Sequence, residues 1–160
     1  MKHTAILFSI MAALLLTACS SKKPAIQTAS YREQPTQCLG KSMDGHQTLQ
    51  VWAKGQSRME AVREAKKKVI GEVLFSGIQS NGDCNAMPIV DAPNARTKFE
   101  KYFQKFFEDN GGYKKYVEEI EKRSDAQHLQ GEHLQVYGVV LQVDMDGLRK
   151  RMRKDKIIEY

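Results

Sequence analysis

The chain has 160 residues, of which 41% are hydrophobic and 28% charged, so it is neither disordered nor collagen-like. Its 25 lysines and arginines outnumber 19 acidic residues, which gives a formal net charge of +6. Three cysteines are too few for a disulfide-dense miniprotein or for a zinc site of four thiolates. We therefore expect one folded domain, since two would be cramped in this length.

The first eighteen residues have the pattern of a secretory signal peptide. A short positive start precedes a largely apolar stretch, residues 5–16, which is too short to span a bilayer as a mature helix. Leu16-Thr17-Ala18-Cys19 follows and resembles the bacterial lipobox. The resemblance implies cleavage before Cys19, a diacylglycerol on its sulfur and a third acyl chain on the new amino terminus. The alternative is an ordinary signal peptide followed by an unrelated cysteine.

Several acyl chains would hold the mature chain, residues 19–160, on a membrane almost permanently. The residue after Cys19 is Ser20 and not Asp, which by analogy with enterobacterial lipoproteins favours the outer membrane. The analogy leaves the leaflet open, and we expect the folded domain in the periplasm. Residues 19–37 are predicted to form an acylated flexible tether, because the segment is rich in Ser, Lys, Pro, Gln and Thr and lacks apolar periodicity. A single folded domain should then occupy residues 38–160.

The two remaining cysteines, Cys38 and Cys84, are an even pair in an oxidising compartment. Their bridge would close a loop of 47 residues, which the loop-entropy argument values at no more than about 4 kcal/mol. Neither cysteine lies in a C-x-x-C motif, so we expect a structural disulfide rather than redox-active thiols.

The first half of the domain shows a strand, a helix and a loop. Residues 48–54 alternate apolar and polar side chains and predict a strand. Ser57 and Glu60 form a capping box that begins a helix with apolar residues at helical spacing, and Gly77 ends it. Residues 79–93 contain Asn, Gly, Asp and Pro and predict a loop.

A second helix is predicted over residues 95–109, with large aromatic side chains on one face. These residues are Phe99, Tyr102, Phe103, Phe106 and Phe107. Packing in the core explains them most simply. The alternative is a face for binding in a groove or for oligomerisation, because five rings on four turns exceed what a small domain often needs.

The second half of the domain predicts two paired strands and a last helix. Residues 113–123 fit either a helix or a strand, whereas residues 134–143 are rich in β-branched side chains and predict the strongest strand. We pair that strand with one over residues 116–130. Asp144 or Asp146 should cap a helix over residues 148–154. The sequence thus predicts an α+β fold in β-α-α-β-β-α order, a three-stranded mainly antiparallel sheet with two to three helices packed on one face.

Two segments resemble a known group of bacterial lipoproteins. Ala53-Lys54-Gly55 leads into Glu60-Ala61-Val62-Arg63-Glu64-Ala65, and residues 139–144 run directly into Leu148-Arg149-Lys150. This arrangement resembles the LPP20-type lipoproteins and the related N-terminal domain of the flagellar assembly protein T group. The resemblance covers about residues 48–156 and implies an α+β fold with an envelope role and no known reaction.

Few residues suggest catalysis or metal binding. His128 and His133 could face each other across a hairpin, with His46, Asp44 or Glu132 as a third metal ligand, but their spacing matches neither H-E-x-x-H nor H-x-x-E-H. Helix capping explains Ser57 and the Asp144 and Asp146 pair more simply than catalysis. We therefore expect no enzyme activity, no metal and no cofactor.

The C-terminal segment is strongly basic. It holds six cations among eight residues: Arg149, Lys150, Arg151, Arg153, Lys154 and Lys156. A solvated helix face is the simplest interpretation, and the functional one is a patch for an anionic partner, a lipid headgroup or a wall polymer. Nucleic acid is disfavoured for an anchored envelope protein. The sequence favours an outer-membrane-anchored, non-catalytic accessory or assembly component with an envelope protein partner. The alternatives are an adhesion or scaffold subunit that uses the aromatic helix and a periplasmic metal-dependent hydrolase.

Overall fold

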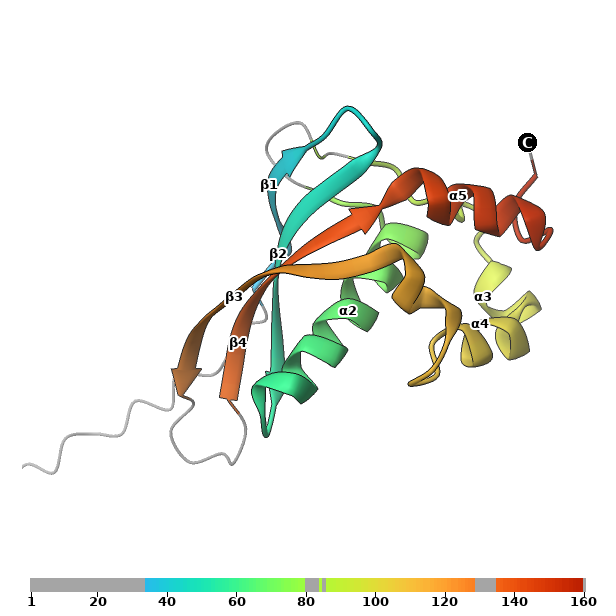
Figure 1. Ribbon diagram of the computed structural model, residues 1–160. Helices are drawn as coiled ribbons and strands as arrows, with labels where there is room; N and C mark the ends of the chain where they lie inside the picture. The colour runs from blue at the N-terminus through green and yellow to red at the C-terminus, as the bar shows by residue number, and fades with distance from the viewer. Residues whose placement is uncertain (1–33, 80–83, 85, 129–134, 160) are drawn as a thin grey trace, which may run out of the picture.

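The computed structural model describes residues 34–79, 84, 86–128 and 135–159, with backbone only for residues 122–128. The signal peptide, Cys19 and most of the predicted tether lie outside this part. The strands form one antiparallel sheet in the order β1-β2-β4-β3, and the helices lie on one side of it (Figure 1). The strands are β1 (Gln37–Lys41), β2 (His46–Gly55), β3 (Val117–His128) and β4 (Gln135–Asp144). The helices are α2 (Arg58–Phe75), α3 (Ala95–Lys98), α4 (Glu100–Phe106), the 3-10 helix η1 (Gly112–Tyr116) and α5 (Met145–Lys154).

The α+β class is as predicted, but the three-stranded sheet and the β-α-α-β-β-α order are wrong. The described chain has four strands, and β1, which begins inside the predicted tether, pairs with β2. This strand has only five residues, and its register with β2 is irregular between Cys38 and Gly40. The alternation of apolar and polar side chains that marks a strand is therefore not visible in the sequence. The turn into β2 uses Gly45 at a φ of +86°, a conformation that glycine adopts without strain.

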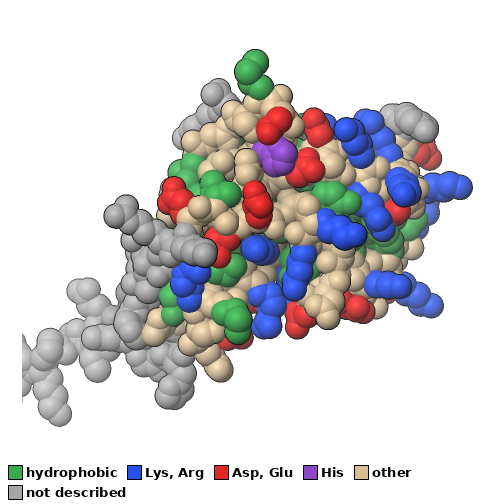
Figure 2. Space-filling model, in the orientation of Figure 1, with side chains coloured by type: hydrophobic (Ala, Val, Ile, Leu, Met, Phe, Trp, Pro, Cys, Tyr) green, Lys and Arg blue, Asp and Glu red, His purple; other side chains and the backbone are tan. Residues whose placement is uncertain are grey.

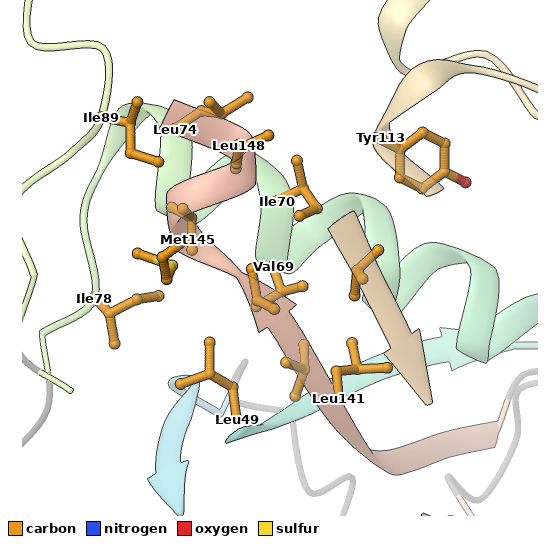
Figure 3. Packing of buried hydrophobic residues seen from close by; sticks show 14 of the residues in the cluster. Leu49, Val69, Ile70, Leu74, Ile78, Ile89, Tyr113, Leu141, Met145 and Leu148 are labelled. Atoms are coloured by element: carbon orange, nitrogen blue, oxygen red, sulfur yellow. The ribbon is translucent and has the colours of Figure 1, made fainter. Parts of the chain in front are cut away.

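Helix α2 and the sheet enclose the hydrophobic core (Figure 3). The predicted cap is confirmed, since Ser57 Oγ accepts a hydrogen bond from the Glu60 amide, while the Glu60 carboxylate accepts one from the Gln56 amide. The buried face of α2 consists of Ala61, Ala65, Val69, Ile70, Val73 and Leu74. Facing it on the central strands are Leu49, Val51, Val139, Leu141 and Val143.

The aromatic segment is two short helices, not the single helix predicted over residues 95–109. The helical path breaks at Phe99, whose φ and ψ are −113° and 29°, and α4 ends at Phe106. Phe103 packs edge-on against Phe75 of α2 with ring centroids 4.8 Å apart. Contacts between residues far apart in the sequence thus decide the path of this segment, and a local periodicity does not record them.

Residues 113–123, which fit either a helix or a strand, contain both. Tyr113 lies in η1, and the chain enters β3 at Val117. Strand β3 then pairs with β4 along a register that shifts twice, between Glu119 and Glu121 and again before Asp125. The strand predicted over residues 116–130 is therefore present but irregular.

Candidate functional site

The basic C-terminal segment lies mostly on helix α5, which is packed against the core. The helix begins at Met145, three residues before the predicted start, because the Asp144 side chain accepts a hydrogen bond of 2.7 Å from the Gly147 amide. One side of the helix is buried in the core through Met145, Leu148 and Met152. The cations of α5 therefore extend from a fixed helix rather than from a loose tail.

A hydrogen-bonded network joins α5 to α4. Asp155 Oδ2 accepts from the Tyr102 hydroxyl and from Arg151 Nε, each at 2.6 Å. Burial and the hydrogen bond to Asp155 raise the pKa of Tyr102 to about 12. Hydrogen bonds to Tyr102 and Asp155 raise the pKa of Arg151 above its ordinary value. These contacts join α4 to the C-terminal end of α5 at neutral pH.

Lys98 of α3 and Lys101 and Lys105 of α4 are exposed, and they belong to the segment that Tyr102 joins to the end of α5. Figure 2 shows lysine and arginine side chains gathered on the side of the molecule where Figure 1 places these helices. All seven cations of the group are exposed, and none forms an ion pair within the described residues. We call this group the basic surface, which consists of Lys98, Lys101, Lys105, Lys150, Arg153, Lys154 and Lys156.

The structure divides the six predicted patch residues into two sets. Lys150, Arg153, Lys154 and Lys156 are exposed and belong to the basic surface. The other two take part in ion pairs, Arg149 with Asp146 at 3.7 Å and Arg151 with Asp155 at 2.6 Å. Their charges are therefore largely balanced within α5.

Sequence reasoning missed the contribution of α3 and α4. A count of charges along the sequence could have indicated this contribution. Residues 95–107 and 145–159 together contain ten basic and four acidic side chains, a net charge of +6. That value equals the formal charge of the whole chain. The count alone could not show that the two segments meet, because their contact depends on tertiary packing.

The aromatic rings of α4 point into the domain. Phe103 and Phe106 are buried, and Phe106 stacks against Tyr102 at a centroid distance of 5.8 Å. Within the described chain, the exposed large hydrophobic side chains are aliphatic: Leu39, Met43, Met59, Met87 and Ile120. Phe99, Tyr102 and Phe107 are half-buried, and the alternative of an adhesion or scaffold subunit stays a prediction.

The structure joins Cys38 of β1 to Cys84 in a disulfide, with Cα atoms 5.7 Å apart. The bond connects the first strand to the loop that follows α2. Beside it, Ile78 and Ala86 pair as an isolated β-bridge. The predicted acylation residue, Cys19, lies outside the described residues.

The two histidines that could face each other across a hairpin lie outside the described side chains. His128 ends β3, where its backbone pairs with Gln135, and its side chain and His133 lie outside the described part. His46 lies 3.1 Å from the Asp44 carboxylate, and hydrogen bonds from Ser42 and His46 lower the pKa of Asp44 to about 2. Across the described residues, no three His, Cys, Asp or Glu side chains are placed to hold a metal ion.

Comparison with known proteins identifies no relative. No family model, no curated protein and no solved structure matches the chain. The resemblance to LPP20-type lipoproteins therefore stays a prediction. Among the described residues, no helix is both long and apolar enough to cross a membrane.

Proposed function

We propose that the chain is a lipoprotein anchored to the outer membrane, with a folded periplasmic domain that serves as a non-catalytic accessory or assembly component of the cell envelope. The observation that carries the proposal is the N-terminal order of a positive start, an apolar stretch and Leu16-Thr17-Ala18-Cys19. Strand β1 begins at Gln37, eighteen residues after Cys19, which leaves room for a tether. The Cys38–Cys84 disulfide suits an oxidising compartment.

Anchoring would itself be the main mechanism of such a protein. A tether holds the domain near membrane partners and raises its effective concentration there without any new contact. Two side chains that could be read as catalytic, Ser57 and Asp144, have structural roles instead, which supports a non-catalytic function. Ser57 caps α2 and Asp144 caps α5, each by accepting a backbone hydrogen bond. An envelope protein is the partner we propose.

Acylation is the first point to test. Cells given a radiolabelled fatty acid should incorporate the label into the wild-type protein and into Cys84→Ser, but not into Cys19→Ser. The mass of the mature N-terminal peptide should match a triacylated cysteine at position 19. Membrane fractionation should place the wild-type protein with the outer membrane. A protein that keeps its signal peptide, or carries no acyl chain at Cys19, would contradict the proposal.

A further inference from the structure

The basic surface extends over helices that are far apart in sequence but close in space. Lys101 and Lys105 lie one turn apart on α4, on either side of Tyr102, which contacts α5 through Asp155. Lys150 and Lys154 also lie one turn apart and next to Arg151, whose side chain faces Asp155. The cations of the two helices therefore flank a single contact and share one side of the molecule.

The concentration of charge on this side points to an anionic partner. Residues 95–107 and 145–159 together carry a net charge of +6, so the remaining residues of the mature chain, residues 19–160, sum to −1. Like charges on one surface repel one another, and a surface of negative potential relieves that repulsion. A membrane leaflet with anionic headgroups presents such a potential over an area as wide as the two helices.

The anchor would keep that surface within reach. The fifteen residue-to-residue steps from Cys19 to Gln34 span at most about 50 Å when fully extended. A domain of about 120 residues has a radius of gyration of roughly 14 Å, so a tether of this length lets any side of the domain meet the leaflet. The anchor alone therefore does not determine which side of the domain faces the leaflet, whereas the distribution of charge on the domain does.

We infer that the basic surface docks on the anionic phospholipid headgroups of the membrane that carries the anchor. Docking turns α4 and α5 toward the leaflet and directs the opposite face of the sheet away from it. Lysine ammonium groups and the Arg153 guanidinium bind the headgroup phosphates through charge-assisted hydrogen bonds. The inference rests on the proposed function, because only an anchored chain is held beside the leaflet.

The test uses the acylated mature protein in three kinds of vesicle: neutral phosphatidylcholine alone, phosphatidylcholine with phosphatidylglycerol, and phosphatidylcholine with lipopolysaccharide. The measurement is the rate at which an amine-reactive reagent labels Lys105 and Lys150, read by mass spectrometry. Docking should slow the labelling of both on anionic vesicles and not on neutral ones. The protection should disappear at about 1 M salt, where the Debye length falls to about 3 Å.

Two charge-reversal variants decide whether the protection belongs to this surface. Lys101→Glu with Lys154→Glu keeps both reporter lysines, and the matched control is Lys41→Glu with Lys66→Glu, which changes the net charge by the same amount. Each basic residue near an anionic surface strengthens binding about fivefold, so the first variant should weaken docking by about 25-fold or more. The control variant should remain protected.

The possible outcomes separate the inference from the proposed function. Equal labelling on neutral and anionic vesicles that both retain the protein would overturn the docking inference and leave the anchor in place. Protection only on vesicles that contain lipopolysaccharide, or equal loss in both variants, would also overturn it. A mature protein that is isolated from cells without an acyl chain on Cys19, before any vesicle is used, would instead overturn the proposed function.

Discussion

The single tryptophan of the chain packs against a glycine on the neighbouring strand. Trp52 and Gly138 are register partners on β2 and β4, and a Cβ added at Gly138 would lie 3.1 Å from two carbons of the indole ring. That separation is tighter than most carbon contacts, so the ring would have to move. The glycine therefore makes room for the tryptophan.

Gly138→Ala should destabilise the domain by about 1–2 kcal/mol, because the added methyl group overpacks the contact with Trp52. Chemical unfolding followed by circular dichroism measures the change in free energy. Gly71→Ala is the control: nothing lies within 4 Å of its added Cβ in α2, so this variant should stabilise by roughly 0.5–1 kcal/mol. Equal stability of the two variants would contradict this account.

Tyr102 should make stability depend on pH in the alkaline range. Its pKa in the folded state is raised from 10.0 to about 12, so folding favours the protonated hydroxyl. The resulting stabilisation is present below about pH 10 and is lost as the pH rises from 10 to 12. Absorbance titration of the folded protein should show a tyrosinate phase near pH 12 that Tyr102→Phe abolishes. Burial also raises the pKa of Tyr113, so Tyr113→Phe is the control, and persistence of the phase in Tyr102→Phe or its loss in Tyr113→Phe would assign it to another residue.

At the scale of elements, β1 depends on bonds outside itself. It has only five residues, pairs with one neighbour along an irregular register and exposes Leu39. The disulfide joins Cys38 of the strand to Cys84, and Thr36, one residue before the strand, donates a hydrogen bond to Glu72 of α2. We expect the strand to be the first part of the sheet to separate when these bonds are removed.

Replacing both Cys38 and Cys84 with serine should lower the free energy of unfolding by up to about 4 kcal/mol. The amides of β1 should exchange with solvent far faster, while those of the central strands β2 and β4 should lose protection only in step with global stability. Hydrogen exchange followed by mass spectrometry measures both. Reduced wild-type protein should behave as the double variant does, and unchanged exchange in β1 would contradict the expected role of the disulfide.

The elements that the sequence predicts well have strong local signals. Strands β2 and β4 alternate or are rich in β-branched residues, and α2 has both a capping box and an apolar face. The missed strand β1 and the break at Phe99 have no such signal, because a disulfide, a partner strand and the ring of Phe75 determine them. These are contacts between distant residues, and local periodicity does not encode them.

At the scale of the whole molecule, the candidate site was predicted in part. A run of cations marks α5 in the sequence, but two of its six residues form ion pairs in the structure. The lysines of α3 and α4 join the surface through the contact between Tyr102 and Asp155, which lie 53 positions apart. Composition thus reveals how much charge there is, and only the fold reveals where it is concentrated.

The place of the disulfide also determines how an anchored domain would resist mechanical force. Tension on an anchored chain would act first on β1, which begins at Gln37 and has the disulfide-bonded Cys38 as its second residue. Without a covalent bond, such a pull would unzip β1 from β2 one hydrogen-bonded pair at a time. The disulfide to Cys84 would transmit the force from Cys38 to the loop in which Ile78 and Ala86 pair, so the hydrogen bonds between β1 and β2 would bear less of it. If the chain is anchored as proposed, tension on the tether would therefore leave β1 paired with β2.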